Sequence, residues 1–203
     1  LFPIPGLVHD IIWQLRAPRA LAAFACGGLL ALAGALLQAL LRNALADPYV
    51  LGVSSGAALG ALLALVAGAG AALMSMAALA GAACAIAIVF GLSFRSGEWD
   101  IYRLLLTGVV LAAGFSALVS LTLVTASHMQ VKGMLFWLMG DLSYADSPLA
   151  AWIVLLLGTA LATSGARGLD LLALGETKAR SLGLPVKALQ VGVFAVAAAA
   201  TVA

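Results

Sequence analysis

Almost all charged residues of this chain lie in the gaps between six long apolar runs. Of its 203 residues, 65% are hydrophobic and 9% are charged, whereas soluble domains are about a quarter charged. A helix that spans a bilayer needs about 20 apolar residues. The composition therefore excludes a water-soluble globule and points to a bilayer as the solvent. The six runs are 18–41, 49–69, 71–92, 104–126, 149–166 and 188–203.

A bilayer decides the secondary structure of these runs. No water in the hydrocarbon pairs with backbone N–H and C=O groups, so each run must pair its own groups as a helix. The sequence predicts an all-α, polytopic transmembrane helix bundle with about six spans, in one domain over 1–203. The chain begins without Met or a signal segment and its last run stops midway, so we expect an internal piece of a longer protein.

The basic residues in the gaps indicate which ends of the spans face the cytoplasm. If the 167–187 loop is cytoplasmic, alternation places the gaps 42–48 and 93–103 on the same side. Cytoplasmic loops carry an excess of Lys and Arg, so we expect this side in the cytoplasm. It holds Arg42, Arg95, Arg103, Arg167, Lys178, Arg180 and Lys187, against Arg16, Arg19 and Lys132 on the other side.

Glycines recur every four positions in the second run. Gly52, Gly56 and Gly60 are predicted to form one stripe on a helix, where small residues let two helix backbones approach closely in lipid. Such a stripe predicts a tight helix bundle and carries no information about a substrate.

The chain breaks just before this stripe, in the sequence RNALADPYVLG. Pro48 lacks a backbone N–H and disfavours a helical conformation at Asp47. Asn43 can form a local turn, and Asp47 can accept hydrogen bonds from the start of the next helix. The pattern fits a plain helix–helix turn and a gate element equally well.

Several kinds of chemistry have no residues to support them. There is no P-loop motif for nucleotide phosphates, and His9 and His128 belong to no cluster with metal-ligand spacing. Cys26 and Cys84 lie in apolar runs, where cysteine usually acts as a small hydrophobe. The net charge of +2 is too small for a nucleic-acid surface. The span interiors also lack the ionisable residue of ion-coupled carriers, so energy for transport must come from outside this chain.

The segment 171–187 reads LLALGETKARSLGLPVK and concentrates charge between two apolar runs. Gly175 and Gly183 bracket ETKARSL, which is long enough for about two helical turns. Glu176 suits the N-terminal end of such a helix, and Arg180 four residues later supports it. Gly183 fits the position after the helix, and a proline follows. Because so short a helix is marginal alone, it either docks against another surface or is an ordinary solvated loop.

Four stretches of the sequence resemble, in order, the permease subunits of ABC importers for iron-siderophore complexes, haem and cobalamin, the FecCD type. These stretches are QLRAPRALAA, ALAGALLQALLRNALADPYVLGVSSGAALGA, FWLMGDLS and LALGETKARSLGLP. Permeases of this family have about ten spans of about 20 residues each. The resemblance covers essentially the whole chain and implies that the first span and about the last three are missing from it.

The resemblance implies that the 167–187 loop is the cytoplasmic coupling loop, which rests in a groove of a separate ATPase subunit. The motif G-E-x-x-A-R-x-L-G is matched by Gly175, Glu176, Ala179, Arg180, Leu182 and Gly183.

Two further sites are implied at the ends of the spans. In the motif L-R-x-P-R, Arg16 and Arg19 correspond to arginines that meet carboxylates of a substrate-binding protein, and Pro18 between them is expected near a helix start. A cytoplasmic gate is implied at Asn43, Leu45, Ile101 and Tyr102. The sequence departs from the family at Ala44, where a proline is usual, and at Ile101 and Tyr102, where some members carry small hydroxyl residues.

The resemblance therefore implies a non-enzymatic permease subunit in the bacterial inner membrane, with a second permease copy or paralogue beside it. The other implied partners are an ATP-binding cassette subunit, which uses ATP and Mg²⁺, and a periplasmic or lipid-anchored substrate-binding protein. ATP-driven alternating access would carry an iron-siderophore, haem or cobalamin, and this chain is expected to bind no cofactor or metal itself. The rival classes are an ATP-independent carrier or channel, which lacks its carboxylate here, and a structural scaffold, which leaves the coupling motif unexplained.

Overall fold

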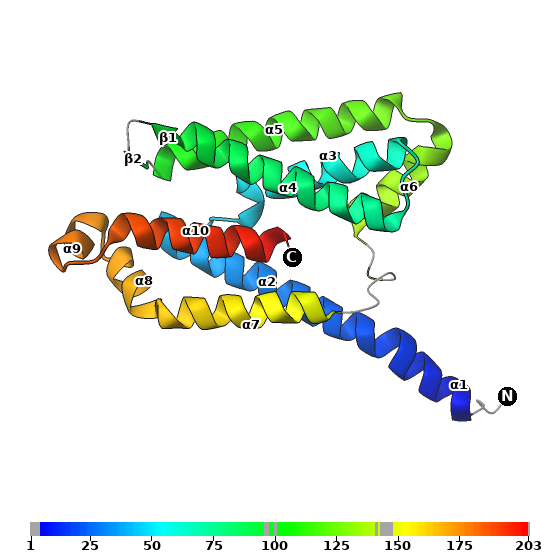
Figure 1. The fold of residues 1–203 in the computed structure, drawn as a ribbon, viewed down its shortest axis with the longest axis horizontal. Helices are drawn as coiled ribbons and strands as arrows, with labels where there is room; N and C mark the ends of the chain where they lie inside the picture. The colour runs from blue at the N-terminus through cyan, green and yellow to red at the C-terminus, as the bar shows by residue number, and fades with distance from the viewer. Residues whose placement is uncertain (1–4, 96–97, 100, 141, 143–147, 203) are drawn as a thin grey trace.

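The computed structural model describes residues 5–95, 98–99, 101–140, 142 and 148–202, and most of this length is helical (Figure 1). A π-helical turn, Ile11–Arg16, joins the first two helices, and a 3₁₀ turn, Pro48–Leu51, precedes the third. Strands β1 (Phe94–Arg95) and β2 (Glu98–Trp99) form a small antiparallel pair that the sequence did not predict. The predicted all-α fold is confirmed. The helices are α1 Pro5–Asp10, α2 Ala17–Leu41, α3 Val53–Val66, α4 Ala71–Ser93, α5 Ile101–Thr125, α6 His128–Met139, α7 Leu149–Ser164, α8 Ala166–Ala173, α9 Glu176–Ser181 and α10 Val186–Val202.

The helices form two groups with α10 between them (Figure 1). One group contains α3, α4, α5 and α6, and the other contains α2, α7, α8 and α9. Helix α10 packs chiefly against α2 and also contacts α3 and α4. Its Phe194 is buried, and its ring meets that of Phe90 on α4 edge-on, with the ring centroids 4.5 Å apart. Helix α10 therefore links the two groups.

Fewer helices are long enough to span a bilayer than the six apolar runs predict. Three helical stretches qualify among the described residues, Val8–Leu41, Ala71–Ser93 and Arg103–Thr125. Helices α7 and α8 add a fourth span if they count as one, although they meet at a 60° bend. Helix α3 has 14 residues and α10 has 17, which is short of the required length.

Helix α3 is short because the chain turns twice before it begins. Pro48 starts the 3₁₀ turn, and Gly52, with φ of +73°, ends it in a left-handed conformation that favours glycine. Pro48, Leu51 and Val53 are all buried, so the non-helical backbone lies inside the protein. Irregular backbone is tolerated at membrane depth where protein covers it. The predicted span 49–69 is therefore a shorter helix with a covered entrance.

Helix α2 begins at Ala17 with Pro18 in its first turn, so the expected helix start near Pro18 is confirmed, although a π-helical turn continues the helical backbone toward the N-terminus. The π-helical turn lies just before this proline, and the backbone N–H of Ala17 bonds to the C=O of Ile12, five residues back. Proline lacks an N–H and its ring crowds the preceding turn. The wider π turn accommodates that crowding, and Val8–Leu41 continues as 34 helical residues, about 51 Å long.

Helices α3 and α4 approach each other through glycine. A Cβ atom on Gly56 would lie 2.7 Å from the carbonyl oxygen of Gly81, and one on Gly60 would collide with the carbonyl of Ala77. Gly52 does not belong to this stripe, because it precedes α3 and faces the backbone of α5 near Ala112. The close backbone contact thus depends on Gly56 and Gly60.

We expect Gly56→Ala to destabilise the protein, although alanine is the better helix former by about 1 kcal/mol. The added methyl would force apart the backbones of α3 and α4, and overpacking of this kind costs about 1–3 kcal/mol. Gly91→Ala on α4 is the matched control, because no atom lies within 4 Å of its added Cβ. Thermal unfolding of the full-length protein in detergent measures both variants, and equal unfolding temperatures would contradict the packing argument.

Candidate functional site

The segment between α8 and α10 folds as a short helix enclosed by two glycines. Helix α9 begins at Glu176 and ends at Ser181, between Gly175 with φ of +112° and Gly183 with φ of +81°. The N–H of Gly183 bonds to the C=O of Arg180, and the N–H of Leu184 bonds to the C=O of Ala179. This is the Schellman arrangement that glycine favours after a helix. The predicted short helix and the position of Gly183 just after it are confirmed.

One face of α9 is attached to the rest of the protein. Ala179 is fully buried. The side chain of Gln190 on α10 donates a hydrogen bond of 2.8 Å from Nε2 to Oε1 of Glu176. The other oxygen of Glu176, Oε2, pairs with Arg180 at 3.6 Å. The carboxylate of Glu176 is thus held within the chain, and sequence analysis did not single out Gln190. An amide side chain in the apolar run 188–203 is the signal that could have found it.

The opposite face of α9 is open. Thr177, Lys178 and Ser181 are exposed. Two leucines flank the helix, and Leu174 is 60% exposed and Leu182 is 63% exposed. A short rigid helix therefore presents a cation between two apolar side chains, and this combination suits a protein groove better than lipid or water.

The corner after α2 is stabilised by its own side chains. The backbone N–H of Leu45 donates to Oδ1 of Asn43 at 2.9 Å, and that of Tyr49 donates to Oδ1 of Asp47 at 2.8 Å. Asp47 is therefore the N-cap of the 3₁₀ turn, as its position before Pro48 suggested. Leu45 is 88% exposed. The corner holds its shape locally and leaves this leucine free for a contact outside the described chain.

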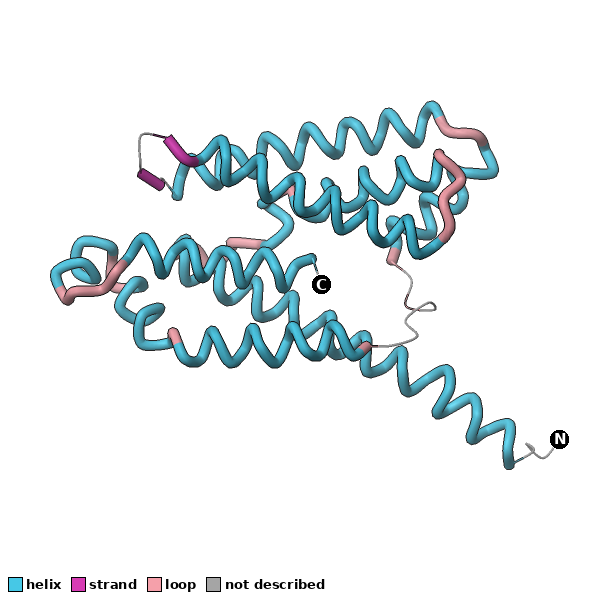
Figure 2. Tube along the Cα trace, in the orientation of Figure 1, coloured by secondary structure: helices cyan, strands magenta, loops and turns pink. Residues whose placement is uncertain are grey.

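This corner lies close to α9. Arg42 adopts a left-handed conformation after α2, with φ of +50°, and its Nη1 would be 3.5 Å from a Cβ on Gly175. The β1–β2 pair is at the same end of the bundle as α9 (Figure 2). Ile101 starts α5 beside this pair. The side chains of Ile101 and Tyr102, both expected at the gate, lie outside the described residues, as do the charges of that strand pair.

The two arginines expected to meet a binding protein lie on the first helical stretch. Arg16 and Arg19 are exposed. Arg16 is the N-cap residue of α2 and Arg19 lies in its first turn, but helical turns precede both, so no free helix N-terminus lies at these arginines. Arg19 is about 33 Å along the helix from Leu41, close to the thickness of a bilayer core. Arg16 and Arg19 therefore lie one membrane thickness from the corner and α9.

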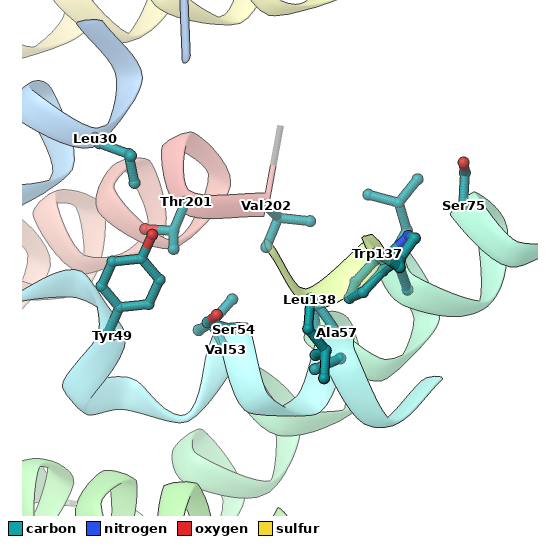
Figure 3. A pocket seen from close by; sticks show the side chains of 14 residues that line it. Leu30, Tyr49, Val53, Ser54, Ala57, Ser75, Trp137, Leu138, Thr201 and Val202 are labelled. Carbon is teal, nitrogen blue, oxygen red and sulfur yellow. The ribbon is translucent and has the colours of Figure 1, made fainter. Parts of the chain in front are cut away.

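Two open cavities meet at the entrance of α3. One has a volume of about 470 Å³, and Figure 3 shows the Tyr49 hydroxyl in it pointing toward Thr201 of α10. The other, of about 410 Å³, faces α5. Tyr49, Ser54 and Leu138 line both. Sequence analysis missed Tyr49, since an aromatic residue in a predicted turn gives no sign of a cavity.

Comparison with known proteins shows what this arrangement is similar to. The vitamin B12 import system permease protein BtuC of Salmonella newport (strain SL254) is 37% identical over 180 residues, which make up 86% of this chain and 54% of that protein. BtuC of Salmonella typhi matches to the same extent. The chain therefore spans about half the length of the curated relatives it matches.

A solved structure has the same fold. The chain superposes on an inward-facing conformation of a metal-chelate type ABC transporter with a TM-score of 0.89 and 31% identity, over 100% of this chain and 65% of that one. The resemblance found in the sequence is thus confirmed. The profile of the FecCD transport family matches residues 4–203, and this chain belongs to that family.

Proposed function

We propose that this chain is part of the permease subunit of a binding-protein-dependent ABC importer for metal chelates of the siderophore, haem or cobalamin kind. The single observation that carries the proposal is α9, a short helix attached to α10 on one face and open on the other. The relatives support it, because one imports vitamin B12 and one is a metal-chelate type transporter. The permease performs no covalent chemistry, and ATP and Mg²⁺ are bound by the partner ATPase.

The end of the bundle that carries α9 faces the cytoplasm. Arg42 lies beside Gly175 there, and the β1–β2 strand pair lies at the same end (Figure 1). These segments carry most of the basic residues, as the positive-inside rule requires. Helix α9 then meets an ATPase on the cytoplasmic side, while Arg16 and Arg19 meet a binding protein on the periplasmic side of the inner membrane.

Transport follows from movement of α9. ATP closes the ATPase subunits, the groove that holds α9 shifts, and the movement changes which side of a two-fold pathway is open. The corner of Asn43 and Leu45 and the start of α5 at Ile101 and Tyr102 form the cytoplasmic gate. Gly175 and Gly183 provide the sharp turns that separate α9 from its neighbours.

The proposal is tested by reconstituting the full-length permease with the ATPase and binding protein encoded beside it. Proteoliposomes should accumulate one of three cargoes, a ferric siderophore, haem or cobalamin, only when ATP and binding protein are both present. Accumulation without ATP would instead identify a secondary carrier or channel. In competition, the substrate is the cargo whose uptake an excess of either of the other two does not reduce.

We expect Leu182→Asp to weaken capture of the ATPase subunit by about tenfold or more, because it places a carboxylate in an apolar contact at the centre of the interface. Met129→Asp is the matched control, since Met129 is also an exposed apolar residue, 89% exposed, but lies on α6 at the far end of the bundle. Copurification of the ATPase with each permease measures the effect. Equal capture by both variants would show that α9 is not the docking helix.

Reversing the charges of Arg16 and Arg19 should weaken capture of the binding protein. Attraction across an exposed rim acts mainly on the association rate, so Arg16→Gln/Arg19→Gln should slow association and Arg16→Glu/Arg19→Glu should slow it further. Stopped-flow or surface measurements at low and high salt give these rates; salt should slow association of the wild type, have less effect on the double Gln variant and speed association of the double Glu variant.

Basal ATP hydrolysis without binding protein is the control for the arginine variants, because the substitutions are a membrane thickness from α9. It should stay at the wild-type rate in both variants. Unchanged association in the double Glu variant would mean that the two arginines only anchor lipid headgroups.

A further inference from the structure

Gln190 is a buried amide in a mostly apolar helix. It lies on α10 with 9% of its surface exposed, one turn before the buried Phe194. Its Nε2 donates to Oε1 of Glu176 at 2.8 Å, across 14 residues of chain. A buried polar group is costly to keep unless it is hydrogen-bonded, so the two side chains hold each other in place.

The geometry around α9 explains why this bond matters. Both ends of α9 are glycines in left-handed conformations, Gly175 and Gly183, and no atom lies within 4 Å of a Cβ on Gly183. Backbone hydrogen bonds across these glycines join α9 to the chain on either side, and pivoting of the helix about the two points is limited further by side-chain contacts. The buried methyl of Ala179 and the bond from Gln190 to Glu176 restrain that pivoting. Of these two, only the hydrogen bond is directional.

The bond also places the charges of α9. One oxygen of Glu176 faces Gln190, and the other faces Arg180, whose side chain is 56% exposed. Loss of the inner contact would free the carboxylate to follow Arg180 outward. The position of Arg180 on the exposed side therefore depends on an amide inside the bundle.

We propose that Gln190 is a positioning residue that makes α9 and α10 move as one body, an inference that rests on the proposed coupling role of α9. A push on α9 then reaches Phe194 and, through its edge-on contact, Phe90 of α4. Without the Gln190 bond the ATPase still docks on α9. Movement of the ATPase then rotates α9 about Gly175 and Gly183 and does not move α10. Docking and transmission thus separate into two measurable properties.

The test uses Gln190→Glu and the exchange Glu176→Gln/Gln190→Glu in the full-length permease assembled with its ATPase and binding protein. In the single variant two carboxylates face each other without a donor. In the exchange, the amide at 176 donates to the carboxylate at 190, so the bond returns with its direction reversed. Three readouts are compared, namely ATPase copurification, binding-protein-stimulated ATP hydrolysis and cargo uptake.

We expect Gln190→Glu to keep ATPase copurification within about twofold of wild type and to lower stimulated hydrolysis and uptake about fivefold or more. The exchange should restore both to within about twofold, which a purely steric role of Gln190 would not predict. Stimulated hydrolysis and uptake at wild-type level in Gln190→Glu would overturn the inference. An exchange that remains as defective, or as poorly folded, as the single variant would overturn it too.

Failure of this inference differs from failure of the proposed function. If Leu182→Asp releases the ATPase while Gln190→Glu transports normally, α9 is the docking helix and only the transmission role is wrong. If wild-type proteoliposomes take up none of the three cargoes with ATP and binding protein, the proposed function itself is wrong.

Discussion

The need to pair every backbone group in hydrocarbon is the constraint on which the rest of this structure depends. It makes each apolar run helical, and it decides where helices are allowed to stop. The chain breaks near Pro48 and Gly52 only because other residues bury that backbone. The bend at Gly165, between α7 and α8, and the π turn before Pro18 are the other departures from straight helices. Each break then sets the direction of the element that follows it.

The type of structure was predictable from sequence, but the lengths of its elements were not. Apolar runs of about 20 residues allow little except helix in a bilayer. They do not tell where a helix is interrupted, because proline is tolerated by a π turn at one place and begins a 3₁₀ turn at another. Pro18 lies inside a helical stretch of 34 residues, whereas Pro48 lies before a helix of 14 residues. Pro48 differs in being buried and in following Asp47, which caps the 3₁₀ turn.

The same limit applies to the candidate site. Helix α9 could be placed from Gly175, Glu176 and Gly183, because capping and charge at helix ends act over a few residues. Its partners could not, since Gln190 and Arg42 come to α9 from other parts of the chain. From the sequence, Glu176 had a role at the helix N-terminus and in a pair with Arg180, with no sign of a partner on α10. The carboxylate of Glu176 instead points to Gln190, and Lys178 remains on the open face.

In the proposed coupling role, α9 passes movement from the ATPase to the permease, and such a helix must be firm along its attached face and separate from the chain on either side. Glycine at both ends gives α9 the separation, since left-handed conformations let the chain reverse within a residue or two. Backbone hydrogen bonds close the two ends of the helix but do not attach it to α10. Ala179 and the Glu176–Gln190 bond supply the missing stiffness from the side. The charged residues of this segment therefore have two roles. Glu176 attaches α9 to α10, whereas Lys178, together with the flanking leucines, remains exposed to a partner.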